Sequence, residues 1–194
     1  MENQFITLPD VQRILDPGRV RSFVGALRDT LKTWNTELAS AQMVLDPAAR
    51  AMNFSRYWYY NANLALSDDT GVKFNTVQNQ RMFTIDERII LRFKLIDRAF
   101  KSKNYPTRKA TQWRLQYPLP GFPPCERLEF GYRLDLTGTG VEDAFILLRV
   151  GNTVVWLWQL WGARIDTFPI QLDLTPIGQT QPIVFAYDNY AVME

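Results

Sequence analysis

The chain has 194 residues, 46% of them hydrophobic, which suits one domain with a sizeable core and excludes disorder over most of its length. Histidine is absent, cysteine occurs once, and the formal net charge is +2. These counts exclude Ser-His-Asp and Cys-His catalysis, an intrachain disulfide, and nearly all zinc sites, whose ligands are mostly Cys and His.

Two Asp-Pro dipeptides predict the starts of two helices, because Asp is a favoured N-cap and proline is tolerated at the first helical position. After Asp16 and Pro17, apolar residues recur at spacings of three and four, which predicts one buried stripe. The stripe consists of Val20, Phe23, Val24, Leu27, Leu31, Trp34 and Leu38. After Asp46, a second helix is expected from Pro47 to about Asn63.

The second predicted helix contains four consecutive aromatic residues, Tyr57, Trp58, Tyr59 and Tyr60. No regular element turns four consecutive side chains to the same side. We therefore expect part of the run to be exposed or to meet a partner. Core packing is one interpretation of the run, and a stacking or protein-binding surface is the other.

Basic residues are concentrated at 88–125, which contains nine of them and a single acid, Asp97. Such a block can hold a phosphate backbone, and aromatic residues among the cations can stack on bases. The candidates for binding nucleic acid or another anion are Arg92, Lys94, Arg98, Lys101, Lys103, Tyr105, Arg108, Lys109 and Arg114. An acidic protein partner, or internal pairing with the acidic 126–194 stretch, would also explain the block.

Apolar residues alternate over 89–95, which predicts a strand with Arg92 and Lys94 on a wetter face. A helix over 83–100 is the competing interpretation. Further on, Thr107 is placed to cap a short helix at 108–117.

The last third of the sequence predicts antiparallel strands. After a proline-rich connector at 118–124, apolar residues alternate over 128–134. Gly151 and Asn152 predict a two-residue hairpin turn. Further strands are expected at 144–150, 153–161, 170–174 and 183–187, and a turn is expected at 138–140.

These elements predict one α+β domain over residues 1–194, with N-terminal helices packed on a C-terminal antiparallel β-sheet. We expect a helical part at about 8–66, a mixed basic part at about 72–117 and an antiparallel β part at about 126–188. No span of the membrane is expected, because Arg149, Asn152 and Gln159 interrupt the most apolar window. The chain begins without a secretory pattern, so a cytoplasmic location is expected.

Motifs for a P-loop or a dinucleotide site are absent, so no cofactor is expected. No metal site is expected either, because adjacent carboxylates on a strand point to opposite faces, and only folding could unite Asp86, Asp135 and Asp143. Cys125 is interpreted as a loop or half-buried residue, with a catalytic thiol as the alternative. Whether the protein is an enzyme stays open.

Histidine-free ribonuclease chemistry is the catalysis that the composition leaves most accessible. Cations would stabilise a pentacovalent phosphate, while Tyr or Lys moved protons. The candidates would be Lys94, Arg98, Lys101, Tyr105, Arg108 and Lys109.

Several stretches carry a resemblance to a group of small bacterial proteins: RIILRFKLID at 88–97, NYPT at 104–107, LPGFP at 119–123, and LEFGYRLD at 128–135 running into Val155-Trp156. Genes of that group lie beside a gene for a helix-turn-helix protein with an ImmA/IrrE-type metallopeptidase-like domain. The resemblance covers about residues 85–160 and implies a toxin-like effector of a toxin–antitoxin or phage-defence module, controlled by an antitoxin-like protein partner. Its motifs mark no catalytic residue. A nucleic-acid-binding protein and a non-enzymatic interaction or structural protein are the alternatives.

Overall fold

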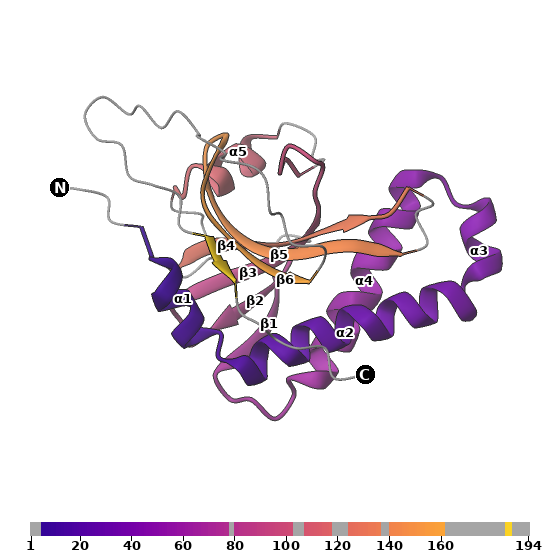
Figure 1. The fold of residues 1–194 in the computed structure, drawn as a ribbon, viewed down its shortest axis with the longest axis horizontal. Coiled ribbons are helices and arrows are strands. Elements are labelled where there is room, and N and C mark those ends of the chain that lie inside the picture. The colour runs from indigo at the N-terminus through magenta and orange to yellow at the C-terminus, as the bar shows by residue number, and fades with distance from the viewer. Residues whose placement is uncertain are drawn as a thin grey trace.

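The fold consists of a strongly curved β-sheet with helices on both of its faces (Figure 1). The computed structural model describes residues 5–77, 80–102, 107–117, 124–136, 140–161 and, as backbone, 185–187. Its helices are α1 (Leu8–Ile14), α2 (Pro17–Thr36), α3 (Ala39–Val44), α4 (Pro47–Ala65) and α5 (Arg108–Arg114). Its strands are β1 (Val72–Val77), β2 (Gln80–Ile85), β3 (Ile89–Leu95), β4 (Glu126–Leu134), β5 (Val141–Val150), β6 (Thr153–Trp161) and β7 (Phe185–Tyr187).

The two long helices begin where the sequence predicts. The Asp16 carboxylate accepts hydrogen bonds from the backbone N–H groups of Gly18 and Arg19, and the Asp46 carboxylate accepts one from Ala49. The α2 helix ends at Thr36, so the predicted stripe residue Leu38 falls just beyond it. The short α5 helix also forms, with the Thr107 hydroxyl accepting from the backbone N–H of Ala110.

The seven strands lie in the sheet in chain order, from β1 to β7. The β3–β4 and β6–β7 pairs are parallel and the other pairs are antiparallel. The predicted α+β class with N-terminal helices packed on the sheet is confirmed, while the sheet itself is mixed. Parallel β3 and β4 require a crossover, and residues 96–125, which include α5, supply it.

Strand β3 confirms the strand interpretation of 89–95 and excludes the competing helix. The hairpin around Gly151 and Asn152 is confirmed as well, since β5 and β6 pair antiparallel on either side of it. Gly151 has a φ of +61°, a left-handed conformation that glycine adopts without strain. The predicted connector at 118–124, apart from Pro124, and the predicted strand at 170–174 lie outside the described residues, and so does most of the turn at 138–140.

Helices α1, α2 and α4 cover one face of the sheet and form the main core with it. Trp58 of α4 stacks on Phe93 of β3, with ring centroids 3.8 Å apart. The Tyr59 hydroxyl accepts a hydrogen bond from the Phe93 backbone N–H at 2.8 Å. Tyr57 and Tyr60 are exposed, Tyr60 at 61%. The expected division of the aromatic run into core and exposed residues is therefore confirmed.

Helix α5 and the turn after β3 cover the opposite face. Trp113 of α5 packs with Ile90 and Cys125, and Phe100 of the turn packs against Phe145 of β5. A side chain at Gly131 of β4 would not fit here, because a Cβ would lie 2.3 Å from Phe145 Cε2. The expectation that Arg92 and Lys94 occupy a wetter face is wrong for Arg92, which is buried, because the crossover covers the strand.

Arg19 joins the start of α2 to two loops. Its guanidinium donates to Asp69 Oδ2 from Nε at 2.7 Å and to Asp86 Oδ2 from Nη1 at 2.5 Å. Hydrogen bonds from Arg19 also lower the pKa of the Asp69 carboxyl. Among the described helices, none is long and apolar enough to cross a membrane.

Arg19→Met should lower the free energy of unfolding by about 2 kcal/mol, because the half-buried Asp69 and the more exposed Asp86 both lose their partner. Urea unfolding followed by circular dichroism measures this. Arg13→Met is the matched control, since Arg13 pairs with Asp10 on the exposed surface of α1 and its loss should leave the midpoint unchanged. Equal midpoints for wild-type and Arg19→Met would contradict the structural role of Arg19.

Candidate functional site

Strand register brings five charged side chains together on the sheet face under α5. In the parallel β3–β4 pair, Arg92 lies opposite Glu129, and Ile90 lies opposite Arg127. Side chains two residues apart on a strand share a face, which adds Lys94 of β3 to this set. In the β4–β5 pair, Glu129 lies opposite Leu147, which places the next same-face residue of β5, Arg149, beside them. We call Arg92, Lys94, Arg127, Glu129 and Arg149 the buried basic cluster.

Four of these charges lie deep in the protein, and Lys94 is half-buried. Arg149 is 4% exposed and Glu129 is 2% exposed, and Arg92 and Arg127 are buried to a similar degree. Charged side chains are almost never fully buried unless they are paired, because the loss of hydration is costly. The stability of the cluster therefore depends on the hydrogen-bond, ion-pair and cation–π partners of each charged side chain.

Glu129 is the carboxylate at the centre of the cluster. Its Oε1 accepts a hydrogen bond from Arg92 Nη2 at 2.5 Å, and its Oε2 lies 3.9 Å from Arg149 Nε. The second distance allows an ion pair but is too long for a hydrogen bond. The single negative charge of Glu129 thus serves two arginines.

Helix α5 and the turn that follows it supply two further partners from above the sheet. The Trp113 ring lies 4.1 Å from Arg92 Cζ and 5.9 Å from Arg127 Cζ, within the range of cation–π contacts. Gln116 Oε1 accepts from the backbone N–H and Nε of Arg127, and Gln116 Nε2 donates to the carbonyls of Arg127 and Arg149. Arg127 Nη1 donates to the Tyr117 carbonyl. The end of α5 is thereby fastened to β4 and β5.

Several buried donors of the cluster have no hydrogen-bond partner among the described residues. They are Arg92 Nε and both Nε and Nη2 of Arg149. The Glu129 Oε2 acceptor is also buried without a hydrogen-bond partner among these residues. Arg127 is well held, so the unused donors are concentrated on Arg92 and Arg149.

The pKa directions agree with an excess of buried positive charge. Burial, followed by the charge of Arg92, lowers the pKa of Lys94 to about 8, and Glu129 opposes this shift. Burial also lowers the pKa values of Arg127 and Arg149, and repulsion from Arg92 contributes to both. Attraction to Glu126 opposes the shift for Arg127, and attraction to Glu129 and Asp97 opposes it for Arg149. Desolvation and neighbouring cations both disfavour the charged form of a basic group.

A second charged pair on this face is satisfied locally. Arg133 Nε donates to Asp143 Oδ2 at 2.8 Å, and Gln159 Nε2 donates to Asp143 Oδ1 at 3.4 Å. The Arg133 guanidinium also lies 5.4 Å from the Phe100 ring. This pair adds no net charge to the site.

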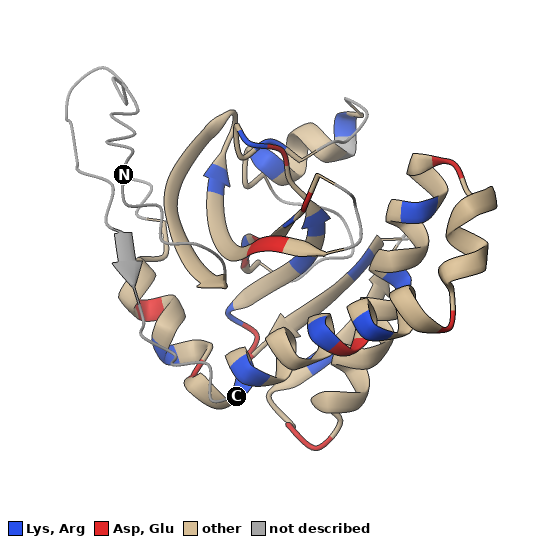
Figure 2. Cartoon of the chain, turned by 45° about the vertical axis from the view of Figure 1, so that its right-hand side comes forward, with Lys and Arg blue, Asp and Glu red and all other residues tan. Residues whose placement is uncertain are grey.

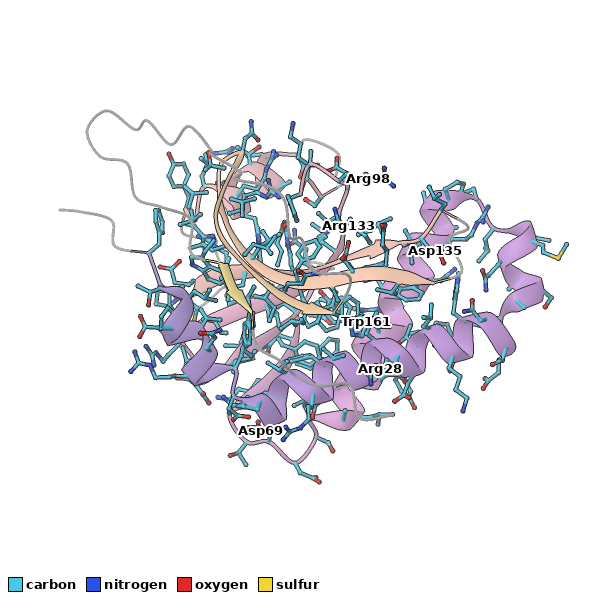
Figure 3. The ribbon with its side chains drawn as sticks, in the orientation of Figure 1. Arg28, Asp69, Arg98, Arg133, Asp135 and Trp161 are labelled. Carbon is cyan, nitrogen blue, oxygen red and sulfur yellow. The ribbon has the colours of Figure 1, made fainter. Side chains whose placement is uncertain are left out.

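The structure separates the predicted nucleic-acid candidates into two groups. Arg92 and Lys94 lie in the buried basic cluster, whereas Arg98, Lys101 and Arg108 are exposed. Arg114 is half-buried, and Figure 2 shows basic bands on α5 and on the strands. Lys103 and Tyr105 lie outside the described residues, as does the side chain of Lys109. Figure 3 shows Arg98 and Arg133 on the side of the sheet away from α2.

The sequence candidates lack Arg127 and Arg149, which complete the cluster. Arg149 was visible only as a charge within the apolar stretch 144–150, a pattern that fits a polar site inside the fold as well as it fits a break in a membrane span. The candidates for ribonuclease chemistry are divided as well, since Lys94 is mostly covered while Arg98, Lys101 and Arg108 are exposed.

The acidic side chains and the Cys125 thiol are weaker candidates for a functional site than the buried basic cluster. Among the residues that the structure describes, no group of three metal-ligating side chains occurs. Asp86 and Asp143 are engaged by Arg19 and Arg133. Cys125 Sγ donates to the Glu87 carbonyl at 3.0 Å, and burial raises the pKa of the thiol, which disfavours the nucleophilic thiolate.

Comparison of the chain with protein-family models, curated proteins and solved structures found no match. The resemblance to proteins of two-gene modules therefore stays a prediction.

Lys94→Met should raise the free energy of unfolding at about pH 7 by roughly 1–2 kcal/mol, because the wild-type buries a charged amine beside Arg92. The folded pKa of about 8 lies below the ordinary value of 10.5, so the wild-type gains stability between these pH values. The advantage of the variant should shrink by about pH 9.5, as measured by urea unfolding. The same difference at both pH values would contradict a buried, charged Lys94.

Proposed function

We propose that the protein binds a nucleic-acid strand through its outer basic surface, which we define as Arg98, Lys101, Arg108 and Arg114. The observation that carries this proposal is the position of these cations. All four belong to the turn after β3 or to α5, the two segments that cover the buried basic cluster. One side of the sheet therefore concentrates the basic charge of the segment.

Acidic residues do little to offset this surface. Asp97 is the acid within the described part of 97–117, and its carboxylate is used by the turn. It accepts hydrogen bonds from the backbone N–H groups of Ala99 at 2.9 Å and Lys101 at 2.8 Å. Arginine and lysine side chains that remain exposed can bind phosphates without regard to sequence.

An exposed aromatic residue borders the outer basic surface. Tyr117 follows the end of α5 and is largely exposed. Aromatic rings beside cations provide stacking platforms for the bases of single strands. This combination favours a single strand over a rigid duplex as the ligand.

The triple variant Arg98→Gln, Lys101→Gln, Arg108→Gln should weaken binding of a single-stranded oligonucleotide and reduce the slope of log affinity against log salt by about two, at about 0.7 per lost phosphate contact. Fluorescence anisotropy across a salt series measures both. The control is Arg21→Gln, Lys32→Gln, Arg56→Gln, which removes the same charge from exposed sites on α2 and α4. Wild-type binding that does not weaken with salt, or equal losses in both variants, would refute the proposal.

A second candidate function is a toxin-like effector controlled by a protein partner, as the resemblance implies. The exposed stripe on α4 favours it. Tyr57, Tyr60 and Leu64 follow one another at spacings of three and four and are exposed, Leu64 at 55%. Tyrosine and other large side chains of this kind are typical anchors of protein interfaces.

Expression of the protein alone should arrest growth, and co-expression of the neighbouring gene should relieve the arrest. Tyr57→Ser with Tyr60→Ser should keep the arrest but lose the relief, because the partner loses its anchors while the core residues Trp58 and Tyr59 stay intact. Growth curves of the four strains measure this. Harmless expression of the wild-type alone would refute the effector function.

A further inference from the structure

Arginine donors in the buried basic cluster are incompletely paired. Arg92 and Arg149 both pair with one carboxylate, Glu129. Glu126 and Asp97 act on Arg127 and Arg149 only through longer-range attraction. A buried N–H donor without an acceptor is costly, and proteins keep such groups only when something offsets them. The cation–π contact with Trp113 serves Arg92 and Arg127 and leaves Arg149 without a comparable partner.

We propose that the buried basic cluster binds one phosphate group, with Arg149 as its anchor. This site is separate from the outer basic surface and does not depend on it. Its ligand is a phosphate dianion, either free or at the end of a larger molecule.

The unused donors of Arg149 have the geometry that phosphate requires. Nε and Nη2 are the two nitrogens along one edge of the guanidinium, and both lack a hydrogen-bond partner. Two parallel N–H groups on one edge bind two oxygens of one phosphate side by side. Glu129 leaves this edge open, because its Oε2 lies 3.9 Å from Arg149 Nε, beyond hydrogen-bond distance.

Arg92 has a further unpartnered donor. Its Nη2 is held by Glu129, while its Nε is buried and unpartnered. Both arginines therefore pair with Glu129, and each has N–H donors without a hydrogen-bond partner. A phosphate has more acceptor oxygens and more charge than a carboxylate, so it suits the open edge of Arg149 better than Glu129 does.

The backbone around the cluster is fixed by α5. Gln116 bridges the carbonyls of Arg127 and Arg149, so the cover of the site is bonded to the strands that carry the arginines. An anion bound beneath α5 should therefore stabilise α5 as well as the sheet.

The first experiment measures thermal unfolding in inorganic phosphate against chloride at equal ionic strength. Phosphate at about ten times its Kd should raise the Tm of the wild-type by about 3 °C, because it binds the folded state alone. Arg149→Lys keeps the charge but lacks the two-nitrogen edge, and should weaken phosphate binding about tenfold. Arg21→Gln, on the exposed surface of α2, should respond to phosphate as the wild-type does.

Glu129→Gln should change phosphate affinity in the opposite direction to Arg149→Lys. It removes the negative charge that competes with phosphate and should tighten phosphate binding at least about threefold, although the variant itself is less stable. Hydrogen exchange at the α5 amides should slow in phosphate for the wild-type and for Glu129→Gln. A wild-type Tm equal in phosphate and chloride would overturn the proposal, and so would equal phosphate affinities for wild-type, Arg149→Lys and Glu129→Gln.

Oligonucleotides with and without a 5′-phosphate distinguish the sources of the group. A preference for the phosphorylated end that Arg149→Lys loses assigns the site to a nucleic-acid terminus. Equal binding of both oligonucleotides, with the effect of inorganic phosphate retained, assigns it to a free phosphate. The triple variant of the outer basic surface should keep the phosphate effect, so failure of strand binding and failure of this site are separate results.

Discussion

The parallel pairing of β3 with β4 is the constraint on which the rest of the structure depends. Parallel neighbours cannot be joined by a tight turn, so the chain must cross from the end of β3 to the start of β4. The crossover carries α5 over the sheet face that the N-terminal helices leave open (Figure 1). Arg92 lies in the middle of that face and is sealed from water as a result.

The two faces of the sheet are stabilised in different ways. On the helical face, aromatic rings such as Trp58 and Phe93 stack, and the Tyr59 hydroxyl satisfies a backbone N–H. On the α5 face, apolar residues share the space with charged ones, and the Trp113 ring and the Gln116 amide act as neutral partners for arginines. Neutral partners hold the geometry of a cation without cancelling its charge. The α5 face can therefore keep a net positive interior, which a purely structural ion pair could not.

The basic segment performs two physical roles because folding divides it. Its strand part contributes Arg92 and Lys94 to the interior, and its turn and helix leave Arg98 and Arg108 in water. A low-dielectric interior strengthens the interactions of the first group, whereas salt screens those of the second. The buried and exposed cations should therefore respond differently to salt and to a bound anion, although they lie close together in the sequence.

The sequence by itself determined the local features of this protein, because each depends on residues close together in the chain. The caps at Asp16, Asp46 and Thr107 and the turn at Gly151 follow from local chemistry, and so does the α+β class. The pattern of β3 also showed that Arg92 and Lys94 share a face.

Only the tertiary structure decided whether that face is wet or covered, since alternation reports which side chains share a face and not what lies over it. It also decided the pairing of β3 with β4, which brings Glu129 to Arg92 across 37 residues. Arg127 and Arg149 join the candidate site through the same register. Contacts between distant strands depend on the whole chain, and no local pattern encodes them.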